Sequence, residues 1–453
     1  MSDKQRSSFT GSIGFVLAAA GSAVGLGNIW RFPYLAAKYG GGIFLLIYII
    51  LAVTFGFALM TAEISIGRKT GLSAIGAFEK LNKKFSFLGY IAALVPIVIL
   101  PYYSQIGGWV IKYFYAFISG GGTAAAADGY FGGFITATGE PVFWFFLFLA
   151  ATAIIVLFGV EKGIEKVSKF MMPILVVLTI IIAGYSVSMP GAWEGVVYYF
   201  KPDFSNFSVT TVLAAMGQLF YSMSLAMGIM ITYGSYMKKQ DNIEKSVRNI
   251  EIFDTGIAIL AGLMVIPAVF AFSNGNLADL KAGPSLMFIT LPKVFETMAF
   301  GNIIGVVFFL LVLFAALTSS ISLMETVVSI FCDKLHIERK LSCLLVFLIS
   351  LVVGLVSCFG YSIWADFKII GLQLLDFFDF ISNSVIMPIV AFFTCILVGY
   401  VIKPKAIIEE VESNDAKFKA KKLFVIVIKY VAPIFIVLIL ISSVLSGLGR
   451  ITI

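Results

Sequence analysis

The feature that most constrains this chain is a series of long apolar segments separated by short polar loops. A helix needs about 20 apolar residues to cross a bilayer, and about eleven segments approach or exceed that length. With 60% hydrophobic and 13% charged residues, the chain has too little polar surface to cover a soluble core. We therefore expect an all-α integral membrane protein. The predicted spans are 11–37, 42–66, 86–118, 142–159, 166–188, 209–237, 250–273, 300–331, 340–358, 367–401 and 421–447.

The polar loops predict the orientation of the chain. Lysine and arginine gather in alternate loops, such as 67–84, 161–169 and 403–422, and the intervening loops carry few. By the positive-inside rule the N-terminus, with Lys4 and Arg6, is cytoplasmic, and an odd number of spans places the C-terminus outside. The net charge of +7 therefore belongs to the loops. We expect a multi-pass protein of the cell membrane, in contact with lipid and not with nucleic acid.

Two predicted spans contain sequences that a helix serving only to cross lipid does not need. The first holds GSAVGLGNIWRFPY at 21–34, and the sixth holds YSMSLAMG at 221–228. Gly21 and Gly25 have the spacing of close helix packing, and spacing alone does not decide between packing and binding. Breaks at corresponding positions of two five-helix halves are nevertheless the pattern of an inverted-repeat transporter.

A break in a membrane helix has a chemical consequence. Each unpaired backbone group costs several kcal/mol in hydrocarbon, so a break persists only where a polar partner satisfies it. Free carbonyl groups can coordinate a cation, and free N–H groups at the start of a half-helix can bind an anion. An amino acid, with its carboxylate and ammonium groups, fits both.

Together these sequences closely resemble the neurotransmitter:sodium symporter family. The resemblance covers nearly the whole chain, and it implies sodium-coupled uptake of amino acids or amines. Besides 21–34, it rests on GQLFYSMSLAMG at 217–228, DTGIAILAGLMVIPAVFAF at 254–272, GPSLMFITLPKVF at 283–295 and AALTSSIS at 315–322.

The resemblance implies a single transporter domain, 1–453, with a LeuT-type 5+5 inverted repeat. Helices one to five would occupy 11–190, and the inverted helices six to ten would occupy 209–401. Helices one and six are discontinuous in this fold. One extra C-terminal helix, 421–447, would complete the type of bacterial member that has eleven helices.

The family also implies a substrate site between the two breaks. The substrate carboxylate would lie on the N–H groups of Leu26 and Gly27 and the hydroxyl of Tyr103, with Tyr102 as the competing choice. The side-chain pocket would favour a hydrophobic or aromatic amino acid. The implied substrate residues are Ala23, Leu26, Gly27, Ile99, Tyr103, Tyr221, Ser222, Ser224, Met227, Ser319 and Leu323.

Two sodium ions are implied by the same resemblance. The substrate carboxylate would complete the first site, so sodium and substrate would favour each other's binding. Asp254 is a departure, since the family's bacterial leucine transporter has asparagine at that position. The first site comprises Ala23, Asn28, Ser222 and Asp254. The second comprises Gly21, Val24, Ala315, Thr318 and Ser319.

Two gates are expected on either side of the substrate site. Outside, Arg31 would pair with Asp379, with Asp376 as the alternative. Exposed ion pairs contribute about 0–1 kcal/mol, which suits a contact that must open in every cycle. The inner gate would comprise Arg6, Asp333 and Tyr236, with Phe9 as an aromatic plug.

Two further features concern helix five and chloride. Gly163 and Pro173 have the spacing with which the family unwinds helix five, although an ordinary proline kink has the same sequence. Eukaryotic members bind chloride near the first sodium ion, and the surroundings of that anion match Tyr48, Gln218 and Ser222. Because Asp254 and Glu63 could supply the negative charge, we expect transport that does not require chloride.

Other classes of protein are less consistent with the sequence. The four cysteines lack a ligand spacing and the single histidine lies in a charged loop, so we do not expect an enzyme. A channel would need a continuous polar pore. A transporter of another small amine and a non-transporting sensor with the same fold remain alternatives. The sequence leaves the carried amino acid, the sodium stoichiometry and the oligomeric state open.

Overall fold

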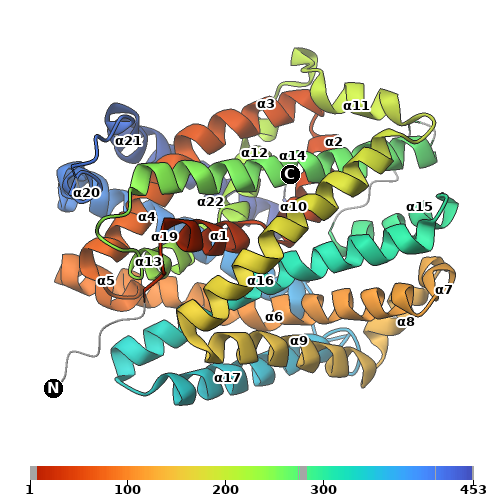
Figure 1. Ribbon diagram of the computed structural model, residues 1–453, viewed down its shortest axis with the longest axis horizontal. Coiled ribbons are helices and arrows are strands. Elements are labelled where there is room, and N and C mark those ends of the chain that lie inside the picture. Colours follow the sequence, from red (N-terminus) through yellow and green to blue (C-terminus); the bar gives the residue numbers. More distant parts are fainter. Residues whose placement is uncertain (1–7, 274, 276–282, 414, 451–453) are drawn as a thin grey trace.

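The computed structural model describes residues 8–273, 275, 283–413 and 415–450, and its regular elements there are helices (Figure 1). Nine helices in this part are long and apolar enough to cross a membrane. A further span is a bent pair, α1 (Ser12–Ala23) followed by Gly27–Lys38, with an angle of 54° between them. The all-helical fold with a broken first helix is therefore confirmed.

The predicted sixth span is also broken. It consists of α12 (Val209–Ser222) and α13 (Ile229–Gly234), separated by an irregular segment at 223–228. Because α12 alone is shorter than a full span, a total of eleven spans depends on counting this pair as one. Four of the nine continuous spans are single helices: α9 (Glu140–Leu157), α14 (Ile243–Ser273), α16 (Gly301–Leu335) and α17 (Arg339–Phe359). Two contain one α-helix after a short helical turn: Lys83–Ile118 with α6 (Ser86–Ile118), and Val160–Val187 with α10 (Lys166–Val187). Three contain two α-helices each: Gly42–Thr70 with α3 (Gly42–Leu51) and α4 (Phe57–Thr70), Leu374–Val401 with α18 (Leu374–Asp379) and α19 (Met387–Ile396), and Lys421–Gly447 with α21 (Lys421–Ile426) and α22 (Ala432–Gly447).

The tenth predicted span, 367–401, begins later than expected, at Leu374. Ile369 and Leu372 exchange backbone hydrogen bonds of 3.0 and 2.9 Å, and Gly371 between them has a φ of +84°. This tight turn prevents a continuous helix. Its residues are mostly apolar, so hydrophobicity alone does not distinguish the turn from the helix that follows.

The two broken helices lie inside the bundle. Figure 1 shows α1 near its middle, and α1 packs against α10, α14, α16 and α13. The short connecting helices lie at the two ends of the molecule. The N-terminal end carries α5 (Ala74–Leu81) and α20 (Lys403–Val411), whereas the opposite end carries α7 (Gly122–Ala126), α11 (Ala192–Phe200) and α15 (Leu291–Thr297).

Candidate functional site

The break in the first span is shaped by two glycines. Val24 leaves the helix with an extended backbone, φ −74° and ψ 96°. A Cβ atom on Gly25 would lie 2.7 Å from the Ser319 Oγ atom, and one on Gly27 would lie 2.6 Å from the Tyr221 ring. These glycines make room for side chains of other helices, so they serve more than the packing of one helix backbone against another.

The break between α12 and α13 holds strained backbone. Ser224 and Ala226 have left-handed φ values of +52° and +60°, which cost on the order of 1–3 kcal/mol each. Two buried contacts stabilise them. The Ser224 hydroxyl donates to the carbonyl of Ser22 over 3.0 Å, and the Ala226 N–H donates to Glu63 over 2.7 Å. Strain held in place by such contacts is typical of functional sites.

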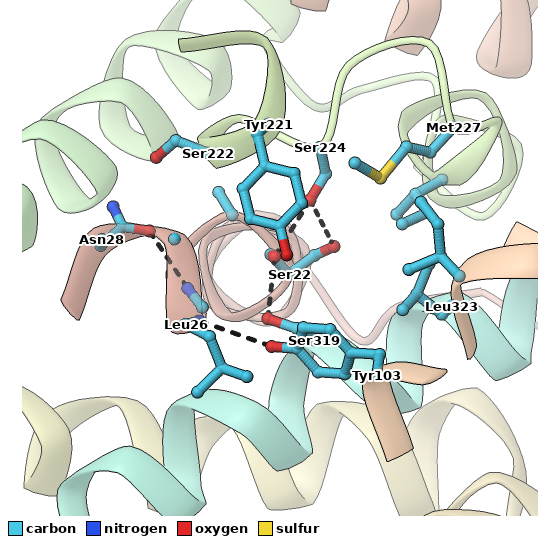
Figure 2. Close-up of a pocket in the computed structure, with 15 residues that line it drawn as sticks. Ser22, Leu26, Asn28, Tyr103, Tyr221, Ser222, Ser224, Met227, Ser319 and Leu323 are labelled. Atoms are coloured by element: carbon cyan, nitrogen blue, oxygen red, sulfur yellow. Dashed lines mark hydrogen bonds between the residues drawn. The ribbon is translucent and has the colours of Figure 1, made fainter. Parts of the chain in front are cut away.

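A narrow cavity lies between the two breaks (Figure 2). Its free volume is about 30 Å³. Met227 and Leu323 lie on one side of it and Asn28 on the opposite side, as Figure 2 shows. All of the implied substrate residues line this cavity: Ala23, Leu26, Gly27, Ile99, Tyr103, Tyr221, Ser222, Ser224, Met227, Ser319 and Leu323. Ser22, Gly25, Asn28 and Ile229 also line it and were not among the implied substrate residues, although Asn28 was implied for the first sodium site.

The two adjacent tyrosines of the third span point to different places. The Tyr103 hydroxyl faces the cavity and accepts a long hydrogen bond, 3.5 Å, from the Leu26 N–H. The Tyr102 hydroxyl instead donates to Asp379 over 3.1 Å. Of the two candidates for the carboxylate contact, Tyr103 is therefore the one placed at the cavity.

The implied first sodium site forms a polar cluster around Asp254. Its carboxylate accepts hydrogen bonds from Asn28 (2.8 Å), Ser222 (2.7 Å) and Tyr48 (3.3 Å), and it is fully buried. Ala23, the remaining implied ligand, lines the adjoining cavity. Carboxylate, amide and hydroxyl oxygens are the ligand types that hard cations prefer.

The residues of the implied second sodium site meet between α1 and α16. The Ser319 hydroxyl lies 3.4 Å from each of the carbonyl oxygens of Gly21 and Val24. The Thr318 hydroxyl donates to the Ala315 carbonyl over 3.1 Å. None of these groups carries a full charge, so the cluster suits a monovalent cation better than a divalent one.

Arg31 and Asp379 line a second cavity, which adjoins the substrate cavity at Tyr221 on the side toward the opposite end. No ion pair within 4 Å joins these two described residues. The Arg31 guanidinium lies 5.5 Å from the centroid of the Tyr221 ring, and Asp379 accepts a hydrogen bond of 2.6 Å from Asn383. Asp376, the alternative partner, is exposed. The outer-gate pair stays a prediction.

The N-terminal end is closed by aromatic side chains. Phe9 is fully buried and makes edge-to-face contacts with Tyr233 and Tyr236, at centroid distances of 5.7 and 6.2 Å. Arg6 lies outside the described residues, so its predicted pairing with Asp333 is untested. Asp333 accepts a hydrogen bond of 2.8 Å from the Ser73 N–H.

A buried ion pair at the same end was not predicted. Glu325, fully buried in α16, pairs with Arg339 at the start of α17. Glu325 also accepts a hydrogen bond of 2.7 Å from the Tyr236 hydroxyl, and Arg339 donates to the Val156 carbonyl over 2.7 Å. A carboxylate inside the apolar sequence SISLMETVVSI was the available signal, because ionisable residues within spans are usually functional.

Helix five begins with a π-helical turn, Val160–Glu165. A Cβ atom on Gly163 would lie 2.2 Å from the Ile155 carbonyl oxygen, so this turn requires glycine. The buried Glu165 carboxylate accepts hydrogen bonds from the Thr10 N–H (2.8 Å) and from Lys169 (2.6 Å). Pro173 lies inside α10. The turn is thereby attached to the segment that precedes α1, and its unwinding stays a prediction.

Comparisons with known proteins identify the family of this chain. A model described as the sodium:neurotransmitter symporter family matches residues 6–121 and 132–448. The uncharacterized sodium-dependent transporter YhdH of Bacillus subtilis is 34% identical over 452 residues, covering 98% of both chains. An uncharacterized sodium-dependent transporter of Haemophilus influenzae is 32% identical over 458 residues, covering 97% of this chain and 99% of the relative.

A solved structure has the same fold. The crystal structure of MhsT in complex with L-phenylalanine superposes with a TM-score of 0.87 at 37% sequence identity, covering 97% of this chain and 100% of MhsT. The family match spans most of the chain, and the fold, the two helix breaks and the apolar spans agree with it. This protein belongs to the sodium:neurotransmitter symporter family of secondary transporters, and it is a sodium-dependent, multi-pass membrane transporter.

Proposed function

We propose that this transporter carries a hydrophobic or aromatic amino acid into the cell together with sodium ions. The observation that carries the proposal is the cavity between the two broken helices. At one side, the N–H groups of Leu26 and Gly27 and the Tyr103 hydroxyl would hold the carboxylate. The ammonium group would meet the hydroxyl of Ser224 and the carbonyl groups of Ala23, Tyr221 and Ser222.

The remainder of the cavity would hold the side chain. Ile99, Met227, Ile229 and Leu323 are apolar and line it, and they offer no partner for a charged substrate group. A free volume of about 30 Å³ holds roughly two water molecules, so the lining must move apart to admit a large side chain. The flexible thioether of Met227 suits that movement. The complex of MhsT with L-phenylalanine supports the same substrate class for this chain.

Two sodium ions would bind beside the substrate. The first would take oxygen ligands from Asn28, Ser222 and Asp254 and from the substrate carboxylate, so that substrate and ion stabilise each other. The second would be held between α1 and α16 by Gly21, Val24, Ala315, Thr318 and Ser319. Because this second site joins two helices and includes no substrate atom, it would hold α1 against α16.

Chloride would not be required. The hydroxyls of Tyr48 and Ser222, which would otherwise surround an anion, both donate to Asp254. A fixed carboxylate would therefore take over the role of a mobile anion in balancing the sodium charge. We expect uptake in gluconate to equal uptake in chloride. An Asp254→Asn variant should need about tenfold more sodium for half-maximal uptake, since about 1.4 kcal/mol of lost attraction is a tenfold change. Loss of wild-type uptake in chloride-free buffer contradicts the expectation that chloride is not required.

The N-terminal end would face the cytoplasm. The lysine- and arginine-rich loops, including 67–84 and 403–422, lie at that end, as the positive-inside rule requires. Substrate would then enter from the side of Arg31 and leave past Phe9. Accessibility of single cysteines to a membrane-impermeant reagent, placed at Lys83 and at Asp128 in turn, tests this assignment. Labelling of the Lys83 position from outside intact cells contradicts it.

The decisive experiment is uptake into proteoliposomes. Radiolabelled phenylalanine and leucine should accumulate above their external concentration when a sodium gradient is imposed, and should not accumulate with potassium. A competition panel of all common amino acids and simple amines defines the substrate class. The proposal is contradicted if glycine, charged amino acids or an amine without a carboxylate inhibit this uptake more strongly than hydrophobic and aromatic amino acids do. Sodium-dependent binding without counterflow would identify a sensor of the same fold.

A further inference from the structure

A basic cavity lies at the N-terminal end of the bundle, away from the substrate site. It has a volume of about 420 Å³ and lies between the start of α14 and the segment 415–420, which leads into α21 (Lys421–Ile426). Figure 1 shows α20 and α21 at the same end as the start of α14. The lining residues are Asn242, Glu244, Lys245, Arg248, Asn249, Lys417 and Lys419, four cationic side chains and one carboxylate.

The cationic side chains of this cavity outnumber its one carboxylate. Glu244 is the acidic residue of the lining. Its two carboxylate oxygens accept hydrogen bonds from the backbone N–H groups of Lys419 (2.9 Å) and Ala420 (3.1 Å). Within the described part of the chain, no carboxylate lies within 4 Å of the ammonium groups of Lys245, Lys417 or Lys419. These three exposed charges therefore repel each other around one hollow, and an anion there would relieve that repulsion.

Arg248 is fixed in place at the same cavity. Its guanidinium lies 3.9 Å from the centroid of the Phe57 ring, and its Nη1 atom donates to Glu251 (3.2 Å) and to the Val53 carbonyl (3.3 Å). A guanidinium has five N–H donors, so these contacts orient the group and leave donors for another acceptor. The planar fork of arginine matches phosphate geometry.

The cavity adjoins surface that faces lipid. Ile252 follows Arg248 by one helical turn and is 69% exposed. Val53 on the neighbouring span and Ile426 on the last span are 43% and 53% exposed. Exposed apolar side chains on membrane spans face acyl chains, so the basic cavity lies where that apolar surface ends. This is the depth of the phospholipid headgroups.

We propose that this cavity binds the headgroup phosphate of an anionic phospholipid. The phosphate would lie among Arg248, Lys245 and the two lysines of 415–420, with the acyl chains along Ile252 and Val53. The lipid would bridge α14 to the segment that precedes the last span. The site shares no residue with the substrate cavity, so the inference does not depend on the proposed transport activity.

Native mass spectrometry of the delipidated full-length protein tests the proposal. Wild type, a Lys245→Gln/Lys417→Gln/Lys419→Gln variant and a control variant are titrated with phosphatidylglycerol and with phosphatidylcholine. The control, Lys83→Gln/Lys84→Gln/Lys340→Gln, removes the same charge from exposed lysines elsewhere. Each basic residue near an anionic lipid surface contributes about fivefold in affinity, so the cavity variant should lose at least about tenfold for phosphatidylglycerol. The control should lose less than about twofold.

The same titrations distinguish the source of the phosphate. Phosphatidylcholine affinity should be equal in all three proteins, and millimolar inorganic phosphate should not displace phosphatidylglycerol. Displacement by inorganic phosphate would assign the cavity to a soluble anion and overturn the lipid proposal. Equal phosphatidylglycerol affinity in wild type and cavity variant would overturn it as well. Because all the substituted lysines are exposed, matching thermal unfolding curves are expected and confirm that each variant is folded.

Discussion

The two ends of this transporter are closed by different kinds of contact. At the N-terminal end, Phe9 is buried between two tyrosines, and Glu325 connects Tyr236 to Arg339. At the opposite end, Arg31 and Asp379 are partly exposed, line a cavity and form no ion pair with each other. The contacts at the N-terminal end are buried and share residues with one another. Those at the opposite end are separate hydrogen bonds and a cation–π contact.

This difference indicates which end resists opening in the conformation described. Removing one member of a buried ion pair leaves a charge without its partner in a low dielectric, whereas exposed polar contacts are readily exchanged for water. Opening the N-terminal end must break several such contacts together. Under the proposed orientation, the structure is closed toward the cytoplasm and needs less change to open outward.

The largest effect should come from Glu325→Gln. Loss of one partner of a buried pair costs about 3–5 kcal/mol, which we discount to roughly 2 kcal/mol because Arg339 is 26% exposed. We expect uptake to fall at least about tenfold and the thermal unfolding temperature to fall by several degrees. Both are measured on purified protein and proteoliposomes.

Two variants control for that result. Glu79→Gln removes an exposed carboxylate, paired with Lys334 at the same end, and should leave uptake within about twofold. Combining Glu325→Gln with Arg339→Gln removes both charges and should restore part of the lost stability. A single Glu325→Gln variant with normal uptake and stability would mean that the buried pair does not close this end.

A smaller effect is expected from Glu165→Gln, which weakens the attachment of the first residues to helix five. The Glu165 carboxylate is 2% exposed and accepts hydrogen bonds from Thr10 and Lys169. Hydrogen bonds to charged groups contribute about 1.5–3 kcal/mol and those to neutral groups about 0.5–1.5 kcal/mol. Because glutamine keeps an acceptor, about 1 kcal/mol should be lost, and the sodium concentration for half-maximal uptake should rise roughly fivefold. Glu161→Gln, which removes an exposed carboxylate from the same turn, is the matched control and should change it less than twofold.

The contrast between the ends also separates what the sequence could predict from what it could not. The substrate cavity follows from two local signals, GSAVGLGN and YSMSLAMG, because each break brings its own backbone groups and neighbouring side chains to the site. Family motifs then supplied Tyr103, Ser319 and Leu323 from other helices. The structure brings these residues together at one cavity.

The closure of the N-terminal end depends on pairings between distant segments. Glu325 meets Tyr236, 89 residues away, and Arg68 meets Glu410, 342 residues away. No local pattern specifies which carboxylate an arginine will reach. The turn at 369–372 was missed for a different reason, since its isoleucine and leucine residues have the same hydropathy as the helix that follows. The buried pairing depends on tertiary contact, whereas the turn depends on the positive φ of Gly371 and on two local hydrogen bonds, which hydropathy does not register.

At the opposite end, Arg31→Gln should affect transport more than stability. Because Arg31 forms no ion pair with Asp379 in this conformation, the thermal unfolding temperature should change by less than the equivalent of about 1 kcal/mol. If the pair forms when this end closes, uptake should fall about fivefold or more. Arg31→Lys retains the charge but not the planar fork, and should retain part of the activity. Equal uptake by wild type and Arg31→Gln would exclude the outer gate.

The smallest effect is expected from Tyr102→Phe, and its comparison with Tyr103→Phe tests which tyrosine serves the substrate. Tyr102 donates to Asp379 over 3.1 Å, but Asn383 donates to the same oxygen over 2.6 Å. Losing one of two donors should cost about 1 kcal/mol or less and change uptake by less than about threefold. Tyr103 alone lines the cavity, so Tyr103→Phe should raise the KM for the amino acid about tenfold with little change in stability. If Tyr102→Phe instead raises the KM more, the carboxylate contact belongs to Tyr102, and the cavity must rearrange on binding to expose a hydroxyl that donates to Asp379 in this structure.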